Sequence, residues 1–261
     1  MIDNHGHLIT LAAILTAFTS SAYGQDVPFA ELRERAQQGE VEAQFNLGVM
    51  YANGDGVPAD EMEAVRWYRV AADQGYAEAQ HYLGVRYAAG RGVTRDGAAA
   101  VRWYRLAGEQ GHVRAQFNLG VIYANGDGAP ADDEEAVRWY RLAADRGDAR
   151  AKYSLGLMYA DGIGVSADDA KAVYWYRLAA EQGQVRAQFN LGVMYADGRG
   201  VPRDYWIAYM WFNLTVSRSS GEMRDRAAER RGRLRKQLTR SQRAEAERLT
   251  REWDAAHPRE P

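Results

Sequence analysis

The chain has 261 residues, of which 46% are hydrophobic and 26% charged, so it can bury a sizeable core and should fold as an ordered globular protein. It contains no cysteine, which excludes disulfide bonds, thiolate zinc sites and cysteine nucleophiles. The net charge of −2 is unevenly spread: residues 218–261 hold 13 basic and 8 acidic side chains, against 20 and 27 in residues 1–217. This excludes a nucleic-acid surface along the acidic main body.

The N-terminus carries an apolar run from Leu8 to Phe18, followed by small and polar residues up to Gly24. Such a run is typical of a secretory signal peptide, and it is too short to cross a bilayer, which takes about 20 residues. We therefore expect a signal peptide over residues 1–24, with cleavage before Gln25, and a periplasmic or secreted mature protein without a transmembrane segment. No Lys or Arg precedes the run, so a buried N-terminal helix of a cytoplasmic protein is the alternative.

Residues 43–218 consist of five copies of one unit with a period of 36 residues. An L-G-x-x-Y motif that begins at Leu47 returns at residues 83, 119, 155 and 191. A G-x-G motif that begins at Gly54 and the aromatic pair Trp67-Tyr68 return at the same shift, the last pair as Trp211-Phe212. A fixed short period of this kind indicates an array of small structural units.

The first half of each unit is predicted to form a helix. Ala43, Leu47 and Tyr51 recur every four residues and therefore share one face. Gly48, beside them, costs helix stability, so its return in all copies predicts a helix contact too close for a methyl group. Gly54 is expected to end the helix in the left-handed conformation that glycine permits.

The second half is predicted to form another helix, which begins at Asp60, a preferred N-cap residue with an equivalent in every copy. Glu63 follows at the spacing of a capping box. Tyr68 lies on the inner face, and Gly75 ends the helix. Neither helix can bury its apolar face alone, so successive pairs must stack. The pattern thus predicts an all-α solenoid of helix-turn-helix repeats.

The order A-x-x-x-L-G-x-x-Y-x-x-G-x-G-V-x-x-D-x-x-x-A-x-x-W-Y-x-x-A-A-x-x-G, from Ala43 to Gly75, resembles the Sel1-like repeat, a relative of the tetratricopeptide repeat. The resemblance covers residues 43–218. It implies a protein–protein interaction scaffold or adaptor without chemistry of its own. Residues 25–42 are interpreted as a half-repeat or N-terminal cap, because Leu32, Ala36 and Gly39 match the end of a unit at the same shift.

Residues 219–261 are predicted to form basic C-terminal capping helices and a short tail. A narrow apolar stripe that includes Ala227 and Leu234 suits one end of a stack, and Thr239 to Gln242 has the pattern of a capping box. The arginine-rich stretch 230–236 could contact nucleic acid, anionic lipid or an acidic partner, or form a solvated helix face. Export would exclude nucleic acid.

The candidate partner-binding residues are those on the first helices that are offset from the packing face. In tetratricopeptide-like arrays first helices form the inner surface, so the resemblance implies that these residues line a concave groove. Asn can pair with a peptide backbone, and Met offers an adaptable apolar contact. The set is Asn46, Met50, Asn53, Tyr82, Arg86, Asn118, Ile122, Asn125, Ser154, Met158, Asp161, Asn190, Met194 and Asp197. Alternatively, Asn46 and its copies only satisfy adjacent repeats; in the first case, replacing Asn118 and Asn190 by Ala weakens binding without lowering thermal stability.

These features predict a non-enzymatic, monomeric scaffold of the bacterial envelope that binds a protein or peptide segment. We expect no cofactor and no metal, because the histidines are scattered and cysteine is absent. A cytoplasmic adaptor is one alternative. A cell-wall hydrolase is the other: Asp161 and Asp197 occupy equivalent positions one repeat apart, about 10 Å by helix packing, near the upper limit for an acid–base pair.

Overall fold

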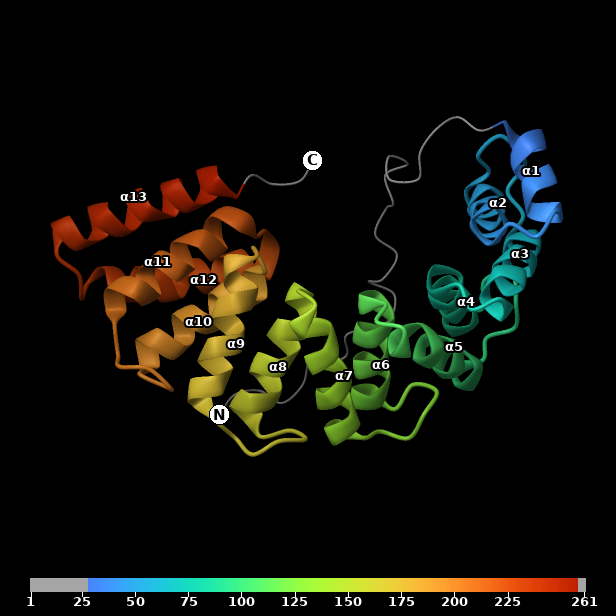
Figure 1. Ribbon diagram of the computed structural model, residues 1–261. Coiled ribbons are helices and arrows are strands. Elements are labelled where there is room, and N and C mark those ends of the chain that lie inside the picture. The colour runs from blue at the N-terminus through green and yellow to red at the C-terminus, as the bar shows by residue number, and fades with distance from the viewer. Residues whose placement is uncertain (1–27, 258–261) are drawn as a thin grey trace. The chain divides into compact units, whose positions relative to one another are not determined.

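The computed structural model describes residues 28–257, and these form thirteen α-helices and no strand. The prediction of an all-α solenoid is confirmed (Figure 1). The predicted signal peptide lies outside the described residues. In chain order the helices are α1 (Phe29–Gln37), α2 (Val41–Asn53), α3 (Glu61–Asp73), α4 (Ala77–Ala89), α5 (Gly97–Glu109), α6 (Val113–Asn125), α7 (Asp133–Asp145), α8 (Ala149–Asp161), α9 (Asp169–Glu181), α10 (Val185–Asp197), α11 (Tyr205–Arg218), α12 (Gly221–Arg235) and α13 (Arg240–Ala256).

The helices belong to two compact units, with the boundary inside α7 after Trp139. In the first unit, α2 packs on α3 and α4 on α5 within repeats, while α3 packs on α4 and α5 on α6 between repeats. In the second unit, α8, α9, α10 and α11 pack on one another in the same consecutive manner. These helices therefore bury their apolar faces against their neighbours in sequence, as expected of a repeat array.

The first helix of a repeat ends as the sequence predicts. Gly54 has φ of +80° and follows α2 directly, and its N–H donates to the carbonyl of Met50. The equivalent glycines after α4, α6, α8 and α10 are also left-handed. A residue with a Cβ would be strained at these positions.

The second helix begins at its predicted aspartate. One carboxylate oxygen of Asp60 accepts from the N–H groups of Met62 and Glu63, at 2.9 and 3.0 Å. Glu63 stands at capping-box spacing, but its carboxylate accepts from Arg66 at 3.0 Å. In a capping box this carboxylate would accept from the backbone N–H of Asp60; here it accepts from the Arg66 guanidinium instead.

Gly48 lies against an aromatic ring of the second helix in its own repeat. A Cβ at this position would lie 2.7 Å from Cδ1 of the buried Tyr68. Gly84 has the same relation to Tyr104, also at 2.7 Å. The predicted close approach is confirmed, and the tyrosine ring is the group that leaves no room for a methyl group.

The recurring tryptophans pack between adjacent helix pairs. Trp67 of α3 joins Leu32 and Ala36 of α1 and Leu47 of α2 in one buried cluster. In the second unit, Trp211 of α11 packs among residues of α9 and α10, including Tyr176. These contacts support core packing as the role of the Trp-Tyr pairs, and they show that α1 covers the start of the array.

The predicted capping helices are present at the other end. Both α12 and α13 pack on α11. Ala227, Leu234 and Ala246 of these helices share a buried cluster with Phe189 and Phe212. The predicted capping box at the start of α13 is also present, because Thr239 and Gln242 exchange side-chain to backbone hydrogen bonds.

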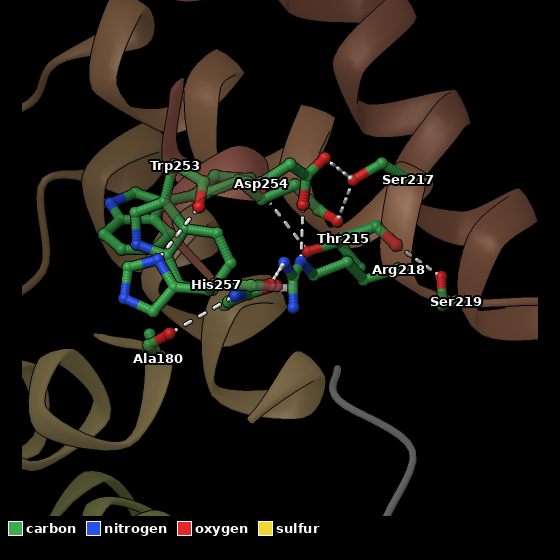
Figure 2. A network of polar contacts seen from close by, with 11 residues as sticks. Ala180, Thr215, Ser217, Arg218, Ser219, Trp253, Asp254 and His257 are labelled. Carbon is green, nitrogen blue, oxygen red and sulfur yellow. Dashed lines mark hydrogen bonds and ion pairs between the residues drawn. The ribbon is translucent and has the colours of Figure 1, made fainter. Parts of the chain in front are cut away.

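A polar network fastens the end of α13 to α11, as Figure 2 shows. Arg218 Nε donates to Asp254 at 2.5 Å, and the same guanidinium donates to the backbone carbonyl of His257. The Trp253 ring lies 4.4 Å from the guanidinium carbon of Arg218. The His257 ring stacks on the Trp253 ring, with 4.0 Å between centroids. Ser217 adds a hydrogen bond to Asp254 at 3.0 Å. The cap is therefore held by charge and stacking as well as by apolar packing.

Candidate partner-binding surface

Several of the predicted partner-binding residues are buried. Each exposes less than a tenth of its surface, which places it among neighbouring helices. They are Arg86, Asn118, Ile122, Ser154, Met158 and Met194. For these six, the structure supports packing between elements in preference to contact with a partner.

Asn118 illustrates why a polar residue of this stripe is buried. It exposes only 2% of its surface, and its Nδ2 lies 3.4 Å from Nε2 of His81 in the preceding first helix. Burial raises the pKa of the neighbouring Tyr104, because a phenolate is disfavoured there. The amide thus lies against a buried polar group of the preceding repeat, the His81 imidazole. The expectation that Asn118→Ala leaves thermal stability unchanged does not fit this environment.

The remaining predicted residues are accessible. Asn53, Asp161 and Asp197 are exposed at the ends of their helices, and the others are half-buried. Asn53 donates to Asp55 of the following loop at 3.1 Å. The half-buried members are Asn46, Met50, Tyr82, Asn125 and Asn190.

The half-buried Tyr82 belongs partly to the packing between the first two repeats. Its ring centroid lies 5.2 Å from that of Phe45 and 5.5 Å from that of Tyr68. Such tilted and edge contacts fix the ring in place. A partner would therefore meet a surface that the fold has already ordered.

Asp161 and Asp197 do not have the surroundings of an acid–base pair. Both carboxylates are exposed at the C-terminal ends of α8 and α10. A catalytic carboxylic acid is normally kept protonated by a closed, apolar pocket. The exposure of both groups argues against the hydrolase alternative.

The repeats are joined by polar contacts that sequence analysis did not identify. Gln44 of α2 donates its amide to the carbonyl of Ala36 at 3.1 Å, and Gln80 of α4 donates to that of Ala72 at 3.2 Å. A glutamine of α10 makes the same bond to α9. These residues recur at the 36-residue shift, which is the signal that could have identified them.

Two of the inter-repeat loops are anchored by ion pairs. Glu61, the first residue of α3, accepts from both Arg86 and Arg91, which belong to the next repeat. In the second unit Arg199 donates to Asp169 at 2.7 Å. These two residues occupy the positions of Arg91 and Glu61 in a later repeat. The second glycine of each of these loops lies against the backbone at the start of the preceding second helix, where a Cβ would overlap it. The loop between helices is therefore part of the junction between repeats.

The part of the chain that the structure describes has no helix long and apolar enough to span a membrane. Among the same residues, no group of three or more His, Asp or Glu side chains is arranged to hold a metal ion.

Comparisons with known proteins place these features in a family. The family model of the Sel1 repeat matches residues 41–76, 77–112, 113–148, 149–184 and 185–218. No curated protein matches the chain.

Among solved structures, a Sel1 repeat protein from Oxalobacter formigenes is 37% identical with a TM-score of 0.70, over 74% of this chain and 79% of that one. A protective antigen present in uropathogenic Escherichia coli strains is 42% identical with a TM-score of 0.72, over 74% of this chain. The match spans only 41% of the antigen's length. The five matched repeats and these similarities show that the chain belongs to the Sel1 repeat family.

Proposed function

We propose that this protein is a non-enzymatic, monomeric scaffold of the bacterial envelope that binds a peptide or helical segment of a partner protein on its first helices. Sel1 repeats generally mediate protein–protein interaction. The observation that carries the proposal is that the last accessible position of the first helix changes between repeats, whereas the buried Leu47 returns in every repeat. Asn53 of α2 corresponds to Ala89 of α4 and to Asp161 of α8, for example.

The surface that we propose consists of accessible residues only. In the first unit it includes Asn46, Met50 and Asn53 of α2, together with Tyr82 and Asn125. In the second unit it includes Asp161, Asn190 and Asp197. Amide side chains can pair with the N–H and C=O of an extended backbone, and Met can adapt to apolar side chains. Affinity would come from apolar and backbone contacts, and selectivity from the residues that differ between repeats.

The envelope location rests on the signal-like N-terminus. It predicts that the protein isolated from the periplasm of its host begins near Gln25. An intact Met1 in a cytoplasmic fraction would contradict the location and support the cytoplasmic adaptor instead.

Site-specific photo-crosslinking tests the surface directly. A photoreactive residue at position 53 should give a crosslinked partner in intact cells. The same residue at Arg102, exposed on the second helix α5, should not. Equal crosslinking from both positions, or crosslinking only from position 102, would contradict the proposed surface. Unchanged melting temperatures of the two labelled proteins are the control for folding.

A further inference from the structure

The turn between α12 and α13 gathers positive charge without any negative charge. Residues 230–243 hold seven basic and no acidic side chains. They form the second half of α12, the turn itself and the start of α13, and Figure 1 shows this turn at the left edge of the second unit. We call residues 230–243 the basic turn. The acidic side chains of the two helices lie outside it, up to Glu229 on one side and from Glu245 on the other.

Hydrogen bonds hold the basic turn in one shape. The Arg243 guanidinium donates to the backbone carbonyls of Arg235 and Leu238, at 3.0 and 3.2 Å. Carbonyls at the end of a helix have no partner within the helix, so these bonds close the end of α12. The capping box of Thr239 then starts α13 directly. The fold therefore fixes where the backbone presents the cations of the turn.

Three cations of the basic turn have no partner of opposite charge. Arg235, Lys236 and Arg240 are exposed. Among residues 28–257, none of the three forms an ion pair. Arg233, by contrast, pairs with Glu229 one turn earlier in α12. Like charges that are close in space repel one another, so a ligand of negative charge would relieve this repulsion.

The basic turn offers charge but no large apolar side chain. Its two leucines, Leu234 and Leu238, expose 9% and 8% of their surfaces and pack in the cluster around Phe189. Nothing comparable is left to enter an apolar phase. Attachment through this turn would therefore stay at the level of surface charges and weaken as salt is added.

The surroundings of the turn favour a flat anionic surface over an acidic peptide. A hollow beside it is lined by Ser241 and Gln242 together with Asp204 and Glu245. An acidic peptide in this hollow would meet two side chains of its own charge. The unpaired cations lie instead on the exposed turn between two helices, which a flat surface can approach.

We propose that the basic turn docks this protein on an anionic lipid surface. Arg235, Lys236 and Arg240 donate to phosphate oxygens of the lipid headgroups. Residues 1–217 hold 20 basic and 27 acidic side chains, so the same surface repels the main body and confines the contact to the turn. The first-helix surface is a separate part of the molecule, and this inference does not depend on the partner that binds there.

Sedimentation with lipid vesicles tests the proposal. At about 0.05 M salt, the full chain should bind vesicles of which about a third is phosphatidylglycerol and the rest phosphatidylcholine. It should not bind vesicles of phosphatidylcholine alone. Raising the salt to about 0.5 M should release it, because the range of the attraction then falls to a few ångströms.

Two variants of equal charge assign the binding to the turn. The turn variant combines Arg235→Gln, Lys236→Gln and Arg240→Gln. It should bind about a hundredfold more weakly, since each basic side chain near such a surface strengthens binding about fivefold. The body variant replaces three exposed arginines elsewhere, Arg33→Gln, Arg102→Gln and Arg146→Gln, and should bind as the unmodified protein does. Equal melting temperatures confirm that both variants fold.

The proposal is wrong if the chain does not sediment with the phosphatidylglycerol vesicles at low salt. It is also wrong if both variants lose binding equally, because net charge and not the turn would then be responsible. Titration with poly-L-glutamate examines the competing occupant. Saturable binding of this polymer, lost in the turn variant and without any binding of vesicles, would replace the lipid surface by an acidic protein segment.

Discussion

His112 combines two roles at the start of α6. Its Nδ1 accepts from the N–H of Ala115 at 3.2 Å, and its ring stacks on that of the buried His81, with 4.5 Å between centroids. Burial lowers the pKa of His112 below its ordinary value of 6.5, Arg114 lowers it further, and Glu78 partly opposes the shift. The folded protein therefore holds this imidazole neutral where the unfolded chain would protonate it.

The lowered pKa of His112 predicts an acid-sensitive first unit. Below pH 6.5 the unfolded chain binds a proton that the folded chain does not, so stability falls as the pH drops toward the lowered pKa. His112→Asn keeps an acceptor for the helix cap and removes the titration. Urea unfolding from about pH 7 to about pH 5 should therefore show a shallower loss for the variant than for the unmodified protein. Parallel losses would show that other groups cause the acid sensitivity.

The surroundings of Gly48 leave no room even for the methyl side chain of alanine. A Cβ would lie 2.7 Å from the ring of Tyr68, and overpacking of this kind costs about 1–3 kcal/mol. Because alanine is the better helix former by about 1 kcal/mol, Gly48→Ala should lower the free energy of unfolding by the difference between these two effects. Gly232 of α12 is the matched control, because it is exposed and a Cβ there would meet nothing within 4 Å. Gly232→Ala should stabilise by up to about 1 kcal/mol. Chemical denaturation measures both changes, and a stabilising Gly48→Ala would refute the packing argument.

Helix ends could be read from single residues because capping is local. The aspartates at N-caps, the left-handed glycines and the capping box of Thr239 are all present in the structure. The capping-box expectation at Glu63 failed for a local reason too, since Arg66 lies one turn away and binds its carboxylate. Element boundaries in this chain depend on neighbours within a few residues, and sequence patterns contain that information.

The contacts of Arg218 are expected to hold α13 against α11. Arg218→Gln removes the ion pair with Asp254, the bond to His257 and the contact with the Trp253 ring. Hydrogen exchange of α13 amides should become faster, while that of α8 and α9 stays unchanged, because the variant favours local opening of the cap.

The control for this experiment lies on α13 itself. Arg248 pairs with Glu245 and Glu252 on the exposed face of that helix. Exposed pairs contribute only about 0–1 kcal/mol, so Arg248→Gln should leave the exchange nearly unaltered. Faster exchange in both variants, or in neither, would show that the contacts of Arg218 do not fasten the cap.

The repeat array was predictable at the scale of the whole molecule, whereas the candidate sites were not. The 36-residue period specifies helix pairs and their order. The burial of Asn118 depends on the rotation of α6 against α4, which the period does not contain. Gly97, Ile122 and Asp127, which replace the ion-paired residues Glu61, Arg86 and Arg91 one repeat later, are far apart in sequence and meet only across a junction. Departures from a repeat are visible in the sequence, but their meeting place is a property of the fold.

The C-terminal cap yields a prediction for the array as a whole. Stacked repeats need a terminal element with a polar outer face, because each repeat presents an apolar surface to the next. Here α12 and α13 cover Phe189, Tyr209 and Phe212, of which the last exposes none of its surface. A chain that ends at residue 218 would leave these rings open to water. It should self-associate more strongly than the full chain at the same concentration, with the effect visible by light scattering and sedimentation.

A shorter truncation separates the loss of the cap from the loss of chain length. A chain that ends at His257 keeps α13 complete together with the contacts between Arg218 and the backbone carbonyl of His257. It should remain monomeric and unfold like the full chain. Exposed apolar patches drive association. A monomeric 218-residue chain with an unchanged melting temperature would therefore contradict the prediction. It would mean that the fifth repeat needs no cover and that α12 and α13 do not serve to close the array.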